Sequence, residues 1–256
     1  MKIALLQYPI QWADPQTNLG LLDERLRAVA GQVELAVIPE MFSTGFCTDR
    51  PGLADEWLTG HTSQALQHMA DEYNLAIVGS MMAMDHGKLY NRGFIFRPND
   101  SPQYYDKHHL YASGGEAEFF TPGNERKLFE FRGVKIRLAV CYDLRFPVWL
   151  RQDKNNLYDI LICVACWPTI RIQYWDALLA ARAAKTTVTA SASTWSAQTD
   201  SNSITTVTPL PMTLGSRTSQ DSTTTNPARV SWTCPSRNCG ISAKSFRNGK
   251  KRMNTN

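Results

Sequence analysis

Three residues with reactive side chains each follow an apolar stretch of this 256-residue sequence. Glu40 ends "VELAVIPE", Lys107 lies in "YYDKHHLY", and Cys141 follows "KIRLAV". A cysteine nucleophile reacts as the thiolate, which a nearby cation favours by lowering the thiol pKa from about 8.5, and a carboxylate can exchange the protons. Taken singly, each residue has a simpler structural explanation: a glutamate capping a strand, a solvated lysine or a buried thiol. Together they predict nucleophilic catalysis by cysteine.

The segments that would position these residues alternate between strand and helix patterns. Apolar runs typical of strands cover residues 2–9, 33–40, 75–82, 88–96, 135–140 and 158–167. Helical patterns run from Asp14–Pro15 to Gly31, from Thr62 or Ser63 to Asn74, and around residues 175–182. The turns "DHGK" and "RGVK" predict two hairpins. This alternation favours an α/β fold, in which sites usually lie where strands end.

Composition narrows the class of protein. Hydrophobic residues make up 43% of the chain, which is enough for a substantial core in one large or two small domains. The longest apolar run, "ILICVACW", is too short to span a bilayer, and Gln7, Pro9 and Gln11 interrupt any secretion signal. Six cysteines in a chain of this length do not indicate a disulfide framework. We therefore expect a cytoplasmic protein with neither a membrane nor a nucleic-acid partner.

Five short motifs in residues 1–184 resemble the nitrilase superfamily of carbon–nitrogen hydrolases. They are "PEMFSTGF", "YDKHHL", "TPGNE", "CYDLRFP" and "WP", in the family's order and spacing. The resemblance implies a four-layer α-β-β-α sandwich, here incomplete at the C-terminus. It also implies a small-molecule amide substrate, no metal or organic cofactor, and homo-oligomers among the intact relatives.

The same resemblance assigns roles to individual residues. It implies Glu40 as general base, Lys107 as the cation facing the tetrahedral intermediate, and Cys141 as nucleophile. A second family glutamate falls on Glu116 in "GGEAEFFTPG", where it would orient Lys107. The backbone N–H of Tyr142 would complete the oxyanion site.

The words "PEMF", "YDK" and "CYDLRFPVW" look most like the omega-amidase branch, which hydrolyses the terminal amide of 2-oxo dicarboxylic acid monoamides such as 2-oxoglutaramate. An anionic substrate requires a positive group, and Arg145 is a candidate for binding its carboxylate. Trp167 is a candidate for a wall of the pocket. The alternatives are a structural ion pair for Arg145 and a core position for Trp167. Another amidase branch, such as a carbamoyl-amino-acid hydrolase, is the alternative function.

Two other groups of residues compete as functional sites. Cys163 and Cys166 form a Cys-x-x-Cys pair, but in a strand these positions point to opposite faces. No second pair of ligands follows in the first 184 residues, so we expect neither zinc nor redox function. His108 and His109, next to Lys107, would allow a Cys–His mechanism, although the lysine explanation covers more of the sequence.

From Lys185 onward the sequence changes character. Ser and Thr supply 27 of the last 72 residues, glutamate is absent, and Lys and Arg outnumber the acidic residues nine to two. Residues 185–256 are either a disordered tail or a frameshifted translation. We favour a frameshift from about residue 184, because one shifted frame permits three motifs that the family resemblance leads us to expect. In the shifted frame, the last base of each codon is read with the first two bases of the next codon. The codons of Ala184 and Lys185 then permit Glu-Asn, those of residues 206–208 permit Gly-Asp-Ser, and those of residues 243–246 permit Glu-Lys-Phe-Pro.

A frameshift would have a physical consequence for the first 184 residues. The lost segment would supply further strands beside the catalytic sheet, so unpaired strand edges and apolar faces would be exposed. We therefore predict that the chain as written is poorly soluble or inactive. The alternative to an amidase is an inactive scaffold whose basic tail binds acidic partners through charge alone, with a steep salt dependence.

Overall fold

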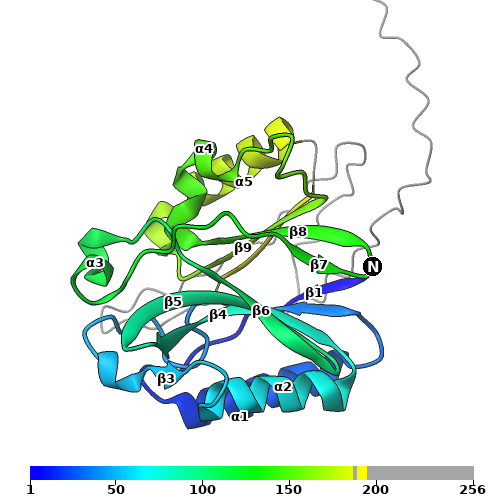
Figure 1. The fold of residues 1–256 in the computed structure, drawn as a ribbon, viewed down its shortest axis with the longest axis vertical. Coiled ribbons are helices and arrows are strands. Elements are labelled where there is room, and N and C mark those ends of the chain that lie inside the picture. Colours follow the sequence, from blue (N-terminus) through cyan, green and yellow to red (C-terminus); the bar gives the residue numbers. More distant parts are fainter. Residues whose placement is uncertain (187–188, 195–256) are drawn as a thin grey trace, which may run out of the picture.

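Two β-sheets face one another at the centre of the computed structural model, which describes residues 1–186 and 189–194 (Figure 1). The first sheet has the strand order β1-β2-β4-β5-β6, with β3 paired to β4. Its strands are β1 (Ile3–Leu5), β2 (Leu35–Val37), β3 (Asp55–Glu56), β4 (Ala76–Asp85), β5 (Lys88–Arg97) and β6 (Asp100–Asp106). The second sheet has the order β10-β9-β8-β7. It contains β7 (Phe129–Phe131), β8 (Val134–Val140), β9 (Ile160–Ala165) and β10 (Thr189–Thr194).

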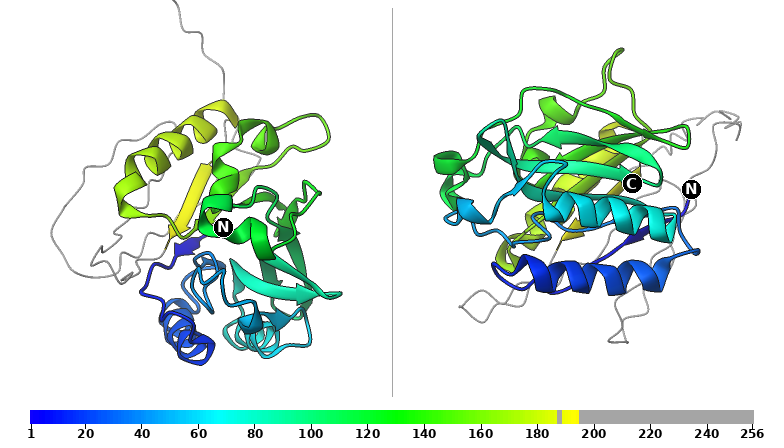
Figure 2. Two further views of the ribbon diagram at one scale, coloured as in Figure 1. Left: turned by 90° about the vertical axis from the view of Figure 1, so that its left-hand side faces the viewer. Right: turned by 60° about the horizontal axis from the view of Figure 1, so that its bottom comes forward.

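Helices cover the outer face of each sheet. The helices α1 (Pro15–Val29) and α2 (His61–Tyr73) lie under the first sheet, while α4 (Pro147–Leu150) and α5 (Ile172–Thr186) lie over the second (Figure 1). The views in Figure 2 show the same succession of layers. The short helix α3 (Glu116–Phe119) and the 3-10 turns η1 (Pro51–Leu53), η2 (Ala112–Gly114), η3 (Cys141–Arg145) and η4 (Thr169–Arg171) lie in the connections. The predicted four-layer α-β-β-α architecture is confirmed.

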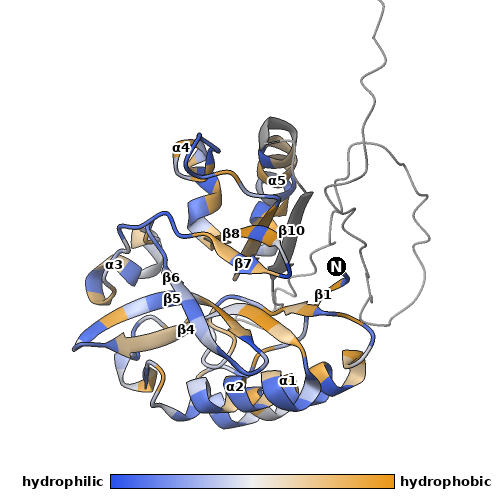
Figure 3. Cartoon of the chain, turned by 45° about the vertical axis from the view of Figure 1, so that its right-hand side comes forward, coloured by the Kyte–Doolittle hydropathy of each residue, from blue (hydrophilic) through white to orange (hydrophobic). Residues whose placement is uncertain are grey.

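Separate apolar cores hold the layers together. Between the sheets, side chains of β1, β2 and β4 pack with those of β8 and β9, and a second core fills the space between the first sheet and its two helices. Leu22 and Leu26 of α1 are fully buried there, and each such side chain contributes about 1.5–3 kcal/mol. Figure 3 shows the hydrophilic residues concentrated on the outer faces of α1 and α2. The cores therefore fix both sheets, whose strand ends carry the reactive residues.

Local sequence signals account for several element boundaries. The helix α1 starts where Asp14 accepts a 3.1 Å hydrogen bond from the backbone N–H of Thr17, with Pro15 at the first helical position. It ends before Gly31, which has a φ of 70°. The predicted β4–β5 hairpin also forms, and both of its turn residues, His86 and Gly87, have positive φ.

The predicted domain boundary at residue 184 falls within an element. The helix α5 continues to Thr186, and β10 pairs in parallel with β9. Residues 187–188 and 195–256, which make up the rest of the predicted tail, lie outside the described residues. Within the described part of the chain, no helix combines the length and apolar character needed to cross a membrane.

Candidate active site

A buried lysine lies between two buried glutamates where strands of the first sheet end. Lys107 follows β6, and its Nζ lies 2.9 Å from Oε1 of Glu40, which follows β2. The same Nζ lies 2.8 Å from Oε2 of Glu116, the first residue of α3. All three residues are at most 1% exposed. Buried charges are stable only when they have partners of opposite charge, and here the Lys107 ammonium forms an ion pair with both carboxylates.

Asn91 completes this cluster, and the sequence analysis missed it. Its Nδ2 donates 2.8 Å hydrogen bonds to Oε1 of Glu40 and to Oε1 of Glu116, while its backbone oxygen accepts from the backbone N–H of Lys107. This orientation of the amide is chemically required, because the reverse would place an oxygen between two carboxylates. The sequence does contain a signal for Asn91: it is a polar residue that alternates with Gly93 and Ile95 along β5 and so lies on the same inward face of the strand.

Cys141 lies at the end of β8, in the second sheet, and faces this cluster. Its φ of 45° is left-handed, which is rare for a residue other than glycine, and places it at a sharp turn into η3. The Sγ lies 3.7 Å from the carbonyl oxygen of Cys166, whose backbone N–H donates a 2.7 Å hydrogen bond to Oε2 of Glu40. Cys166, the residue that directly follows β9, therefore contacts both the sulfur of Cys141 and the carboxylate of Glu40.

The protonation of the cluster differs from the sequence-based expectation. Burial raises the pKa of the Cys141 thiol well above its usual value, Glu40 raises it further, and Lys107 only partly opposes this. Burial also raises the pKa of Glu40, against the attraction of Lys107. Burial disfavours the charged form of Lys107, but the two carboxylates outweigh it and raise its pKa. The lysine was expected to lower the thiol pKa, but burial and Glu40 together outweigh its attraction.

The competing sites from the sequence analysis have other partners. The ring of His108 stacks on Trp149 at 3.7 Å, and that of His109 stacks on Phe146 at 3.6 Å, so both imidazoles pack against aromatic residues. Cys163 is part of the core between the sheets, whereas Cys166 packs against the core between the first sheet and the helices α1 and α2. The two cysteines therefore face different cores, as the strand period predicted.

Three aromatic rings surround Arg145 at the end of η3. Its guanidinium carbon lies 5.2 Å from the ring centre of Trp167, 5.8 Å from that of Tyr174 and 6.0 Å from that of Tyr142. Within the described residues Arg145 has no ion pair, so the structural ion pair considered from the sequence is not observed there. Trp167 is 4% exposed, and its Nε1 donates to the backbone oxygen of Arg171. It combines a core position with contact to Arg145.

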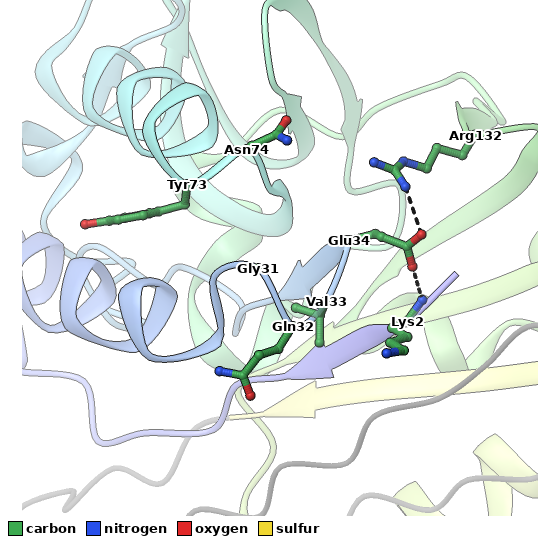
Figure 4. Close-up of a pocket in the computed structure, with 8 residues that line it drawn as sticks. All are labelled: Lys2, Gly31, Gln32, Val33, Glu34, Tyr73, Asn74 and Arg132. Atoms are coloured by element: carbon green, nitrogen blue, oxygen red, sulfur yellow. Dashed lines mark hydrogen bonds and ion pairs between the residues drawn. The ribbon is translucent and has the colours of Figure 1, made fainter.

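A surface pocket of about 370 Å³ lies at the other end of the sheets. Figure 4 shows Glu34 between Lys2 and Arg132, with an Arg132 Nη1 to Glu34 Oε1 distance of 2.8 Å. Lys2 and Glu34 precede β1 and β2, whereas Glu40 follows β2. This pocket is therefore separate from the cluster around Lys107.

Comparisons with known proteins agree with this geometry. A family model described as carbon–nitrogen hydrolase matches residues 2–199. This chain belongs to the carbon–nitrogen hydrolase family. The family's enzymes cleave carbon–nitrogen bonds with water, and a buried Glu-Lys-Glu cluster facing a cysteine is chemically suited to that reaction.

Several individual members of this family are similar to this chain. Omega-amidase YafV of Yersinia enterocolitica is 39% identical over 185 residues, which cover 72% of this chain and 70% of that protein. The 2-oxoglutaramate amidase of Bacillus subtilis is 31% identical over 185 residues, or 71% of each protein. The solved structure of XC1258 from Xanthomonas campestris, a CN-hydrolase superfamily protein with an arsenic adduct in its active site, matches with a TM-score of 0.75 at 31% identity. It covers 80% of this chain and 79% of that one, and the nitrilase-like fold is confirmed.

Proposed function

We propose that this carbon–nitrogen hydrolase is an amidase of the omega-amidase type, which hydrolyses the terminal amide of small 2-oxo dicarboxylic acid monoamides. The observation that carries the proposal is the Lys107 ammonium held between Glu40 and Glu116, with Cys141 facing them. The names of the relatives at 39% and 31% identity support the same substrate class.

The proposed reaction begins with proton transfer from sulfur to Glu40. As Cys141 Sγ attacks the amide carbon, Glu40 accepts the thiol proton, and the negative charge passes to the carbonyl oxygen. Lys107, oriented by Glu116, and the backbone N–H of Tyr142 stabilise that oxyanion. Collapse of the intermediate breaks the carbon–nitrogen bond, Glu40 returns the proton to the leaving ammonia, and a thioester remains.

Water completes the cycle at the same glutamate. Glu40 takes a proton from the water that attacks the thioester, and the carbon–sulfur bond then breaks. The acid leaves and the thiol regains its proton. The steps balance with protein side chains and water alone. They require a reduced thiol, which the reducing environment of the proposed cytoplasmic location would maintain.

Arg145 is the proposed partner of the substrate carboxylate. Its guanidinium has aromatic neighbours and, within residues 1–186 and 189–194, no carboxylate partner, which leaves its charge available to an anion. Trp167 and Tyr142 would then form walls beside that charge. A hydrogen bond to a charged group is worth about 1.5–3 kcal/mol, which corresponds to roughly tenfold to a hundredfold in affinity.

Ammonia release from 2-oxoglutaramate and 2-oxosuccinamate tests the function. We expect the frame-corrected chain to hydrolyse both amides, and the chain as written to show little or no turnover. Carbamoyl-amino acids are the competing substrate class, and preferential release of ammonia from them would assign the protein to another amidase branch. Arg145→Gln should raise KM for these anionic amides about tenfold or more. It should leave a short neutral amide unaffected. Arg97→Gln, on β5 away from the site, is the matched control.

We also propose that residues from about 184 onward are frameshifted. Only 72% of this chain and 70% of the Yersinia relative correspond, and the family match ends at residue 199. The nucleotide sequence provides the test: a second, independent clone with the same frame would rule the proposal out. A frame-corrected chain should release ammonia faster than the chain as written, because the corrected segment would complete the fold and the oligomer.

A further inference from the structure

A buried carboxylate two residues after Cys141 accepts hydrogen bonds from two parts of the chain. Asp143 is 0% exposed. Its Oδ2 accepts from the O–H of Tyr105 at 2.8 Å and from the backbone N–H of Val140 at 3.2 Å. Its Oδ1 lies 2.9 Å from both the backbone N–H and the Nδ1 of His109. Since an ionised carboxylate only accepts, Nδ1 is the donor in the last contact.

These partners connect the two segments that carry the reactive groups. Tyr105 and His109 stand two residues before and two residues after Lys107, at the end of β6 in the first sheet. Val140 precedes Cys141 at the end of β8 in the second sheet. One carboxylate therefore fixes the nucleophile turn relative to the ammonium, across the space between the sheets.

The donors are themselves held in one orientation. The hydroxyl oxygen of Tyr105 accepts a 2.8 Å hydrogen bond from the Nε1–H of Trp149, so the Tyr105 proton points to Asp143. Burial raises the pKa of Tyr105 well above its usual value, and Asp143 raises it further, which keeps the phenol a donor. The stacking of His109 on Phe146 at 3.6 Å fixes the imidazole in the same way.

The backbone of Cys141 needs such a support. A left-handed φ of 45° in a residue other than glycine persists only where the surroundings over-determine it. Asp143 binds the N–H of the residue before Cys141 and belongs to the turn after it. We propose that Asp143 is a positioning residue, whose carboxylate holds the strained Cys141 turn in register with Lys107 for the proposed amide hydrolysis.

Asp143→Asn tests this proposal, with kcat measured in the frame-corrected chain and alkylation in either chain. Asparagine offers one acceptor oxygen, and its NH₂ group would face either the Tyr105 and Val140 donors or the two donors of His109. Because charge-assisted hydrogen bonds are lost, we expect kcat per folded enzyme to fall about tenfold to a hundredfold, with KM within about threefold. Alkylation of Cys141 by iodoacetamide should slow by a similar factor at every pH, since the burial of the thiol and its neighbours Glu40 and Lys107, which together shift its pKa, remain.

A matched control lies at the other end of β8. Asp159 Oδ2 accepts the backbone N–H of Lys135 at 2.8 Å, as Asp143 accepts that of Val140. Asp159→Asn should leave both kcat and the alkylation rate unchanged. A role of Asp143 in stability alone would lower the melting temperature without changing either rate in the folded fraction, and that result would overturn the proposal.

Tyr105→Phe keeps the test decisive if Asp143→Asn does not fold. It removes one donor from Oδ2 but leaves the carboxylate, and we expect about a threefold to tenfold fall in alkylation rate. An unchanged rate in folded Tyr105→Phe would contradict the positioning role. The alkylation assay needs no amide, so a frame-corrected chain that lacks amide turnover but shows these differences would refute the proposed function and leave the role of Asp143 intact.

Discussion

Replacing Asn91 with alanine should move the acidic limb of the kcat/KM profile to higher pH. Asn91 donates a 2.8 Å hydrogen bond to each of the buried glutamates, Glu40 and Glu116. Both bonds stabilise the charged carboxylate, which is the form that Glu40 needs as a general base. Without the donor, Glu40 stays protonated to a higher pH, so activity is lost earlier as the pH falls.

The contacts that remain set the size of this shift. A hydrogen bond to a charged group contributes about 1.5–3 kcal/mol, and one pKa unit corresponds to about 1.36 kcal/mol. Removal of one such bond would therefore raise the pKa of Glu40 by roughly one to two units. Lys107 and the backbone N–H of Cys166 still bind Glu40, which favours the lower end of this range. Since burial already raises the pKa of Glu40, loss of the Asn91 donor shifts it further in the same direction.

The assay is ammonia release from 2-oxoglutaramate by the frame-corrected chain between pH 5 and pH 9. Asn156→Ala is the matched control, because the Asn156 Nδ2 also contacts a carboxylate, that of Asp153, at 3.0 and 3.1 Å, but in a loop away from the site. The control should keep the wild-type profile. A folded Asn91→Ala variant whose acidic limb coincides with the wild type would refute the assignment of Glu40 as the base that Asn91 supports.

Three further substitutions probe other parts of the site. Cys141→Ala should abolish ammonia release without changing the far-ultraviolet circular dichroism, and residual turnover would identify another nucleophile. Lys107→Met leaves two buried carboxylates without a cation and should reduce the free energy of unfolding by about 3–5 kcal/mol in urea titrations, whereas Arg27→Met, which removes an exposed ion pair, should leave it nearly unchanged. Gly123→Ala should lower kcat, because its Cβ would overlap the backbone oxygen of Asp106 and displace the segment that carries Lys107; unchanged kcat would contradict this coupling.

The sequence predicted those elements that depend on local chemistry. The helix α1 and the β4–β5 hairpin follow from Asp14, Pro15 and the His86–Gly87 turn, whose conformations depend on their own residues. By contrast, β3 has only two residues and forms by pairing with β4, and β10 forms beside β9. Strand partners determine such elements, so hydrophobic period alone does not reveal them.

Prediction of the site residues was limited in the same way, because contacts between distant segments are not visible in the sequence. Glu40, Lys107 and Cys141 follow apolar runs, so their position at strand ends was predictable, and the motif resemblance added Glu116. Asn91 lies inside a strand pattern, and only the facing sheet shows that its side chain enters the cluster. Burial was equally invisible in the sequence, because residue types and spacing do not show how much water reaches them.

Burial then decides when the sulfur ionises. Glu40 and Glu116 against Lys107 leave one excess negative charge in a region where water does not screen it, and a resting thiolate on Cys141 would add a second. Attack on a carbonyl avoids this, because the charge moves at once to the substrate oxygen while the proton moves to the carboxylate. A reagent without a carbonyl at the point of attack offers no such oxygen. Cys141 should therefore react slowly with simple alkylating agents at neutral pH yet rapidly with a bound amide, so its selectivity arises from the burial and the Glu40 carboxylate that raise its pKa.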